Sequence, residues 1–163
     1  MPSWQILIIG CMSILAAGCS TSVEFVSAEY DARPVQPLNA KSALAQVNAF
    51  RGKNGLSALV LDERLSRAAA MHSIDQAARS KMGHYGPDGS KPKDRAARAG
   101  YRPKIASENV AAGHKSFSDV MRSWQRSSGH RQNLLRANVA QAGFGMAKST
   151  SGRAYWTLIL GRE

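Results

Sequence analysis

Both cysteines of the 163-residue chain, Cys11 and Cys19, lie within its first twenty residues. The rest of the chain therefore cannot form a disulfide, and it offers no thiol as a nucleophile or metal ligand. A domain of this kind must be stabilised by its hydrophobic core, for which the roughly 125 residues after an N-terminal segment suffice. Hydrophobic residues make up 44% and charged residues 20% of the chain, which is ordinary globular composition. The sequence thus predicts one domain without disulfides.

An apolar segment without charged residues occupies residues 6–17. It is shorter than the roughly 20 residues of a transmembrane helix, and it fits the hydrophobic region of a signal peptide. Small residues and then Cys19 follow, which resembles the lipobox of bacterial lipoproteins, where the cysteine receives a diacylglyceryl group. We predict a signal peptide over residues 1–18, a lipidated N-terminus and flexible tether over residues 19–38, and a globular domain over residues 39–163. The alternatives are an uncleaved anchor and a plain secretory signal, and both also imply export.

The chain carries a formal net charge of +11, from 22 basic and 11 acidic residues. Such an excess favours anionic partners. Export makes nucleic acid an unsuitable partner, so we expect anionic lipid or cell-wall polymer, and a monomer anchored in a membrane and facing the periplasm or cell exterior. Residues 79–104 contain eight basic and two acidic residues. We expect this run to form a solvated face, which could also attract anionic ligands to the neighbouring His84.

Hydrophobic periodicity and capping residues predict a domain of mixed helices and strands. The expected helices begin after Asn39, after Asp62, at Pro92, after Ser116 or Ser118, and after Ser128. The second of them is expected to extend to about Lys81, and residues 59–61 to form an apolar link. An extended segment over residues 104–112 precedes a hairpin formed by residues 139–147 and 153–160. Because helices and strands do not alternate regularly, we predict an α+β fold in which helices flank an antiparallel sheet.

Four local patterns occur in order along this predicted domain. They are His84 within GHYGPDG, SENV at residues 107–110, WxxSxGHRxN at residues 124–133, and GFGM at residues 143–146 with Tyr155-Trp156 downstream. Their order and spacing over residues 39–161 resemble bacterial members of the CAP superfamily (cysteine-rich secretory, antigen 5 and pathogenesis-related proteins) of the SCP-like extracellular type. The resemblance implies an α-β-α sandwich with a cleft lined by two histidines and acidic groups.

The resemblance assigns the paired histidines to His84 and His130, and the first acid of the cleft to Glu108. Larger eukaryotic members place a second glutamate where this chain has Ser127, whereas shorter bacterial relatives share the serine. A mechanism that needs two carboxylates therefore lacks one of them here, while the predicted fold is unaffected.

These residue types allow several kinds of chemistry. Two imidazoles can bind Zn²⁺ or another divalent metal, so His84 and His130 are the predicted metal ligands. The same groups can share protons with Glu108, which can also act as a general base if burial raises its pKa. The other residues expected to line the cleft are Trp124, Ser127 and Asn133.

Structural roles compete with these assignments. His72 lies on the apolar face of the second predicted helix and is better explained as a core histidine, and His114 as an ordinary loop residue. Trp124 is expected to be a core residue that also walls the cleft. Glu108 can serve as a buried hydrogen-bond acceptor that holds the loop of His84, and Asn133 as a structural clamp or a cleft donor.

Three functions follow. The first is an envelope-anchored domain whose cleft binds a divalent metal or a small or lipidic ligand, as some CAP relatives bind sterols or lipids. The second is a metal-assisted hydrolase of an envelope polymer or peptide, with His84, Glu108 and His130 as catalytic residues. The third is a basic adhesin for anionic wall or membrane components. Because the domain has no cysteine nucleophile and no G-x-S-x-G motif, whether it is an enzyme stays open.

Overall fold

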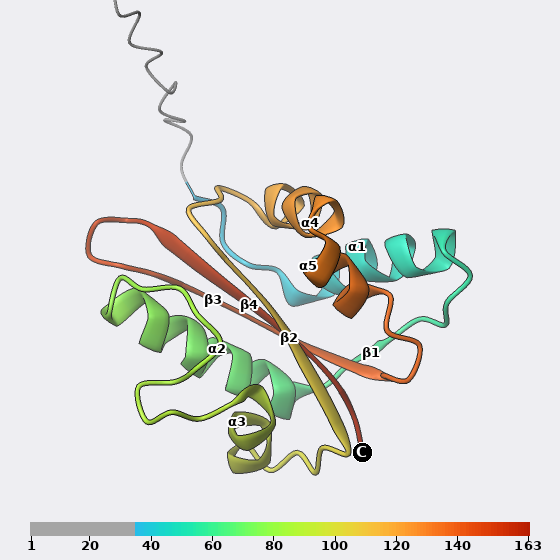
Figure 1. Ribbon diagram of the computed structural model, residues 1–163. Coiled ribbons are helices and arrows are strands. Elements are labelled where there is room, and N and C mark those ends of the chain that lie inside the picture. The colour runs from blue at the N-terminus through green and yellow to red at the C-terminus, as the bar shows by residue number, and fades with distance from the viewer. Residues whose placement is uncertain (1–34) are drawn as a thin grey trace, which may run out of the picture. The chain divides into compact units, whose positions relative to one another are not determined.

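The structure of the protein is a computed structural model, and it describes residues 35–163 (Figure 1). The predicted signal peptide, Cys19 and most of the predicted tether lie outside the described residues. The described part is an α+β domain in which helices cover both faces of a four-stranded sheet, as predicted.

The sheet has the strand order β1-β3-β4-β2. The strands are β1 (Val60–Leu61), β2 (Ile105–Ala112), β3 (Gln141–Lys148) and β4 (Ala154–Arg162). β3 and β4 form the predicted antiparallel hairpin, and β2 pairs with β4 in antiparallel orientation. The apolar link predicted before the second helix contains the short β1, which pairs with β3 in parallel orientation. β2 is thus an edge strand, and this edge carries the site described below.

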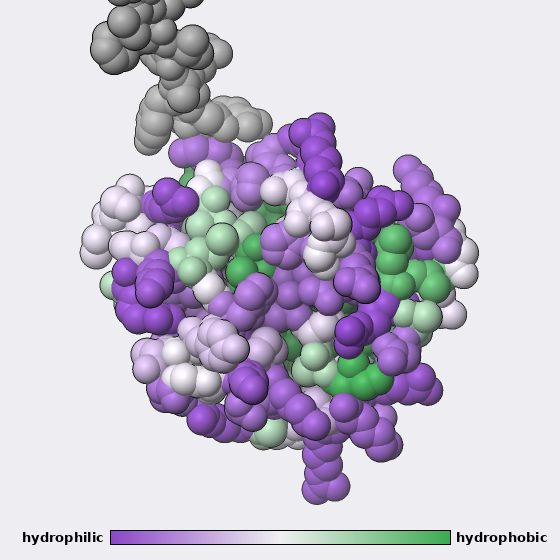
Figure 2. All heavy atoms as spheres, in the orientation of Figure 1, coloured by the Kyte–Doolittle hydropathy of each residue, from purple (hydrophilic) through white to green (hydrophobic). Residues whose placement is uncertain are grey.

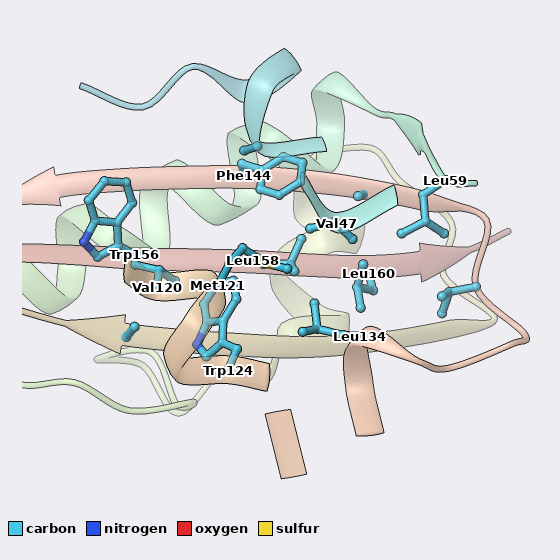
Figure 3. Close-up of a cluster of buried hydrophobic side chains, with 14 of the residues drawn as sticks. Val47, Leu59, Val120, Met121, Trp124, Leu134, Phe144, Trp156, Leu158 and Leu160 are labelled. Atoms are coloured by element: carbon cyan, nitrogen blue, oxygen red, sulfur yellow. The ribbon is translucent and has the colours of Figure 1, made fainter. Parts of the chain in front are cut away.

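The helices form one layer on each face of the sheet (Figure 1). The elements of the first layer are α2 (Glu63–Ala78) and α3 (Pro92–Arg98). Those of the second layer are α1 (Ala40–Lys53), α4 (Phe117–Arg126) and α5 (Ser128–Leu134). The larger hydrophobic core lies under the second layer, where Trp124 of α4 and Trp156 of β4 are each 1% exposed (Figure 3). A smaller core packs α2 and α3 against Ile159 and Tyr101.

Side-chain caps explain where three of the helices begin. The Asn39 carboxamide accepts a hydrogen bond from the backbone N–H of Ser42, and Asp62 and Ser116 cap α2 and α4 in the same way. Two predicted boundaries are wrong by a few residues. α2 ends at Ala78 rather than near Lys81, and the cap residue of α5 is Ser127 rather than Ser128. Ser127 makes no capping hydrogen bond because its hydroxyl contacts a histidine instead.

Two glycines allow α2 to approach the sheet closely. A Cβ atom on Gly143 would lie 2.1 Å from the backbone of Leu65, and one on Gly145 would lie 2.3 Å from the backbone of Ala69. This contact fixes the position of α2 and of the loop that follows it, which carries His84. None of the helices within residues 35–163 combines the length and apolar character needed to cross a membrane.

Candidate functional site

The carboxylate of Glu108 lies at the centre of the candidate site. Glu108 pairs with Ile159 in the β2–β4 register, and its side chain packs in the layer of α2 and α3 with only 1% exposure. One carboxylate oxygen, Oε1, accepts a hydrogen bond from Nδ1 of His84 at 2.9 Å. The other, Oε2, accepts one from Nη2 of Arg95 at 2.6 Å. The predicted role of Glu108 as a buried acceptor that holds the His84 loop is therefore confirmed.

The cation that neutralises this carboxylate is Arg95 of α3. Its side chain is 6% exposed, and its guanidinium also donates to the backbone carbonyls of Ser90 at 2.6 Å and His84 at 3.2 Å. Arg95 belongs to the basic run over residues 79–104 that was expected to be solvated, and for this residue the prediction is wrong. A buried carboxylate requires a compensating charge, and arginine can donate to several acceptors at once. The sequence carried no signal for this burial, because it follows from the way α3 packs, with Arg95 and Ala96 on its inward face.

His84 presents one ring nitrogen to Glu108 and leaves the other unengaged among the described residues. Because a carboxylate only accepts hydrogen bonds, Nδ1 carries the proton and Nε2 has a free lone pair when the ring is neutral. The hydrogen bond to Glu108 raises the pKa of His84 above its usual value, more than burial lowers it. The side chain is 51% exposed, so solvent and ligands can reach it.

The loop before His84 is held by α2. Nε2 of His72 donates to the carbonyl of Gly83 at 2.8 Å, and the N–H of Gly83 donates to Oε1 of Gln76 at 3.1 Å. His72 is fully buried, as predicted for a core residue, and burial lowers its pKa. Its Nε2 also lies 3.7 Å from Oε1 of Glu108. His72 therefore supports the site from beneath, a role that sequence analysis missed because helical spacing shows only which face is buried.

His130 approaches from the opposite layer. It lies in α5, and Nδ1 of its ring lies 2.9 Å from the hydroxyl of Ser127. Trp124 is buried behind it, with the two ring centroids 6.3 Å apart. Burial lowers the pKa of His130, and the proximity of His84 lowers it further. The second imidazole is thus neutral near pH 7, with Nε2 making no hydrogen bond to the described residues.

Asn133 holds α5 against the edge strand. Its amide nitrogen donates to the backbone carbonyl of Glu108 at 3.0 Å and to the side-chain oxygen of Asn109 at 2.9 Å. Asn109 in turn donates to the backbone carbonyl of His130 at 3.0 Å. Of the two roles considered for Asn133, these contacts identify the structural clamp.

The arrangement brings His84 and His130 to the same strand: His84 contacts Glu108 of β2, and Asn109 of β2 donates to the backbone carbonyl of His130. β2 lies between the two helix layers (Figure 1). The arrangement offers the Nε2 atoms of two imidazoles, that of His84 when its ring is neutral, and a serine hydroxyl. The described residues contain no group of three or more histidine, cysteine, aspartate or glutamate side chains placed to hold a metal. Glu108 is turned toward Arg95 and His84, so it orients an imidazole instead of facing the solvent.

Comparisons with known proteins agree with this fold. The model of the CAP family, described as the cysteine-rich secretory protein family, matches residues 44–160. The chain is 36% identical over 117 residues to the uncharacterized protein YkwD of Bacillus subtilis, and the match covers 72% of this chain and 44% of that protein. The chain thus spans less than half the length of this curated relative.

Two solved structures are similar to the described domain. An outer surface protein from Borrelia burgdorferi superimposes with a TM-score of 0.70 at 19% identity, covering 79% of this chain and 98% of that one. An extracellular protein with an SCP domain from Bacillus anthracis superimposes with a TM-score of 0.65 at 25% identity, covering 78% of this chain and 45% of that one. The family match extends over most of the chain and includes His84, Glu108 and His130, so this chain belongs to the CAP (cysteine-rich secretory protein) family.

Proposed function

We propose that this protein is an exported lipoprotein whose CAP domain binds a divalent metal ion or another small ligand between His84 and His130. Export is supported by the apolar segment before Cys19 and by two structural relatives described as an outer surface protein and an extracellular protein. Lipidation of Cys19 would hold the domain at a membrane.

The observation that carries the binding proposal is the engagement of both oxygens of Glu108. Arg95 holds one oxygen and balances the negative charge, while the other oxygen fixes the proton of His84 on Nδ1. A carboxylate that orients a histidine in this way is a common arrangement behind metal-binding imidazoles. The free Nε2 of His84 and that of His130 are then the two groups available to a ligand.

The donor set fits a weak metal site. Zinc in proteins usually has three or four protein ligands, and Ser127 occupies the position where a second carboxylate would add one. His84 and His130 would hold the ion, and Glu108 would act through His84. A bound zinc ion would supply a Lewis acid that polarises an oxygen of a second ligand.

Hydrolysis is less well supported than binding. Glu108 is the only carboxylate among the three residues predicted to be catalytic, and its two oxygens already accept hydrogen bonds from Arg95 and His84. A general base must reach a substrate proton, whereas this side chain is 1% exposed. Binding at the histidines needs no such movement.

A calorimetric titration of zinc near pH 7 tests the site. The protein should be a soluble form that begins at Ser20 and so contains the whole described domain. We expect His84→Ala and His130→Ala each to abolish measurable zinc binding, because each removes one of two ligands. His114→Ala is the matched control, since it removes a partly buried histidine from the loop between β2 and α4, and it should bind zinc as the unaltered protein does. Unchanged zinc affinity in both site variants would contradict the metal proposal.

The anchor has a separate test. Intact mass of protein extracted from membranes should correspond to a chain that begins at Cys19 and carries acyl groups. Cys19→Ser should move the protein to the soluble fraction, because each buried methylene of the lost acyl chains contributes about 0.8 kcal/mol to membrane binding. A mature chain without acyl mass would contradict lipidation and leave the zinc experiment unaffected.

A further inference from the structure

Most of the large hydrophobic side chains that are exposed on the domain come from one segment of the chain, residues 71–85. Four of them, Met71, Ile74, Met82 and Tyr85, are between 49% and 62% exposed and lie on the outer side of α2 or in the loop that follows it. Hydrophilic residues cover most of the surface seen in Figure 2, and hydrophobic residues form small separate patches there. A cluster of exposed hydrophobic side chains on a small domain indicates an interaction site. We call these four residues the α2 outer face.

The two helical members of the α2 outer face are placed by helix geometry. Met71 and Ile74 are three residues apart, so they project from the same side of α2, opposite the buried Leu65 and His72. Beside Met71, a groove of about 490 Å³ separates α2 from α3 and the loop before it. Ala68, Pro87 and Ala99 contribute apolar surface to this groove. Its charged lining residues are three arginines and two aspartates: Arg67, Arg95, Arg98, Asp75 and Asp88.

The segment that contributes and follows this apolar surface is rich in positive charge. Residues 79–104 contain seven exposed basic residues and only two acidic ones, because the eighth basic residue, Arg95, is buried against Glu108. One of the two acids, Asp88, is paired with Arg98. In the sequence, Arg79 and Lys81 come between the hydrophobic residues of α2 and those of the following loop. The surface therefore combines apolar side chains with an excess of cations.

We propose that the α2 outer face docks on an anionic lipid surface. Met71, Ile74, Met82 and Tyr85 would enter the interface between headgroups and acyl chains, while the neighbouring arginines and lysines contact lipid phosphates. A soluble polyanion would use the cations but gain little from exposed methionine and isoleucine. A second copy of the chain would bring the same positive charges together and be repelled.

This proposal rests on the anchoring at Cys19 proposed above. The 17 residues from Cys19 to Val35 cannot extend beyond about 60 Å, so a lipidated chain keeps the domain close to the bilayer. Tyr85 is adjacent in sequence to His84, so docking through this face would bring the histidine site to the level of the headgroups. The ligand of that site would then come from the membrane surface.

Vesicle co-sedimentation of the unlipidated form beginning at Ser20 tests the proposal. Vesicles of phosphatidylcholine with phosphatidylglycerol are compared with phosphatidylcholine alone, at low and physiological salt. We expect binding only to the anionic vesicles, and a fall of about tenfold in the partition coefficient of Met71→Ser/Ile74→Ser. Val60→Ser is the matched control, because Val60 is 61% exposed but lies on β1. Lys81→Gln should weaken binding more than Lys53→Gln, which alters the end of α1.

Three results would overturn the proposal. The first is equal vesicle binding by Met71→Ser/Ile74→Ser and Val60→Ser. The second is competition by a soluble polyanion: it abolishes vesicle binding, and the double variant and the unaltered protein bind it with equal affinity. The surface would then recognise an anionic polymer and not a membrane. The third is an unaltered protein that is a dimer and does not bind vesicles, and that becomes a monomer in the variant Met71→Ser/Ile74→Ser. The soluble form carries no anchor and needs no zinc, so these results are independent of the tests of lipidation and metal binding.

Discussion

Replacing Arg95 by methionine should destabilise the domain strongly, because it leaves the Glu108 carboxylate buried without its cation. Methionine keeps most of the side-chain volume, so the change removes the charge and the hydrogen bonds with little cavity formation. The lost contacts are those to Oε2 of Glu108 and to the carbonyls of Ser90 and His84.

The magnitude follows from the burial of the pair. The side chains of Arg95 and Glu108 are 6% and 1% exposed, so water cannot replace the guanidinium. Removing one partner of a buried ion pair typically costs about 3–5 kcal/mol. With a urea m-value of about 2 kcal/mol/M, the unfolding midpoint should fall by about 1.5–2.5 M. Glu108→Gln in the same chain removes the unpaired charge, so the double variant should be less destabilised than the sum of the two single variants.

Urea unfolding of the soluble form measures these free energies. Arg98→Met is the matched control on the same helix, because Arg98 pairs with Asp88 in an exposed position and its loss should cost far less. Equal free energies of unfolding for Arg95→Met and Arg98→Met would refute the reasoning. Strict additivity of Arg95→Met and Glu108→Gln would refute it as well, since the two residues would then be independent.

Further predictions concern titration, packing and the clamp. The hydrogen bond to Glu108 raises the pKa of His84, so the stability this residue contributes is present below the unfolded pKa of about 6.5 and lost as pH rises through the higher folded value. Unfolding free energies measured between about pH 5.5 and 8.5 should therefore show the advantage of the unaltered protein over His84→Gln declining with pH. Gly145→Ala should destabilise the domain by more than about 3 kcal/mol because the new Cβ meets the backbone of α2, whereas Gly129→Ala, with open space around it, should not lower the melting temperature. Asn133→Ala should cost about 1–3 kcal/mol in urea unfolding by leaving the side-chain oxygen of Asn109 and the carbonyl of Glu108 without this donor.

Local signals in the sequence predicted most of the fold. Asn39, Asp62 and Ser116 are capping residues whose effect depends only on the next turn of helix. The structure uses Asn39 and Asp62 as predicted, and of the two predicted alternatives Ser116 and Ser118 it uses Ser116. The hairpin of β3 and β4 is local as well. The parallel pairing of β1 with β3 depends on residues about eighty positions apart, and the two-residue β1 carries no periodicity that would reveal it.

The sequence predicted which histidines and which carboxylate form the candidate site, but it did not predict all of their contacts. His84, Glu108 and His130 were identified through ordered motifs, and the structure places all three along β2. Arg95 was missed because a buried arginine has the same sequence signature as the exposed Arg98 three residues later. Its partner comes from another element, so only the three-dimensional packing of α3 against β2 reveals the pair.

The most direct test of the proposed binding site is nitrogen NMR of the four histidine rings during a zinc titration of the soluble form. Before zinc is added, the neutral ring of His84 should carry its proton on Nδ1, as its contact with Glu108 requires. Addition of zinc should then shift the Nε2 resonances of His84 and His130 with a common midpoint and leave those of His72 and His114 unchanged. A proton on Nε2 of neutral His84, or zinc shifts confined to His72 or His114, would contradict a site built from His84 and His130.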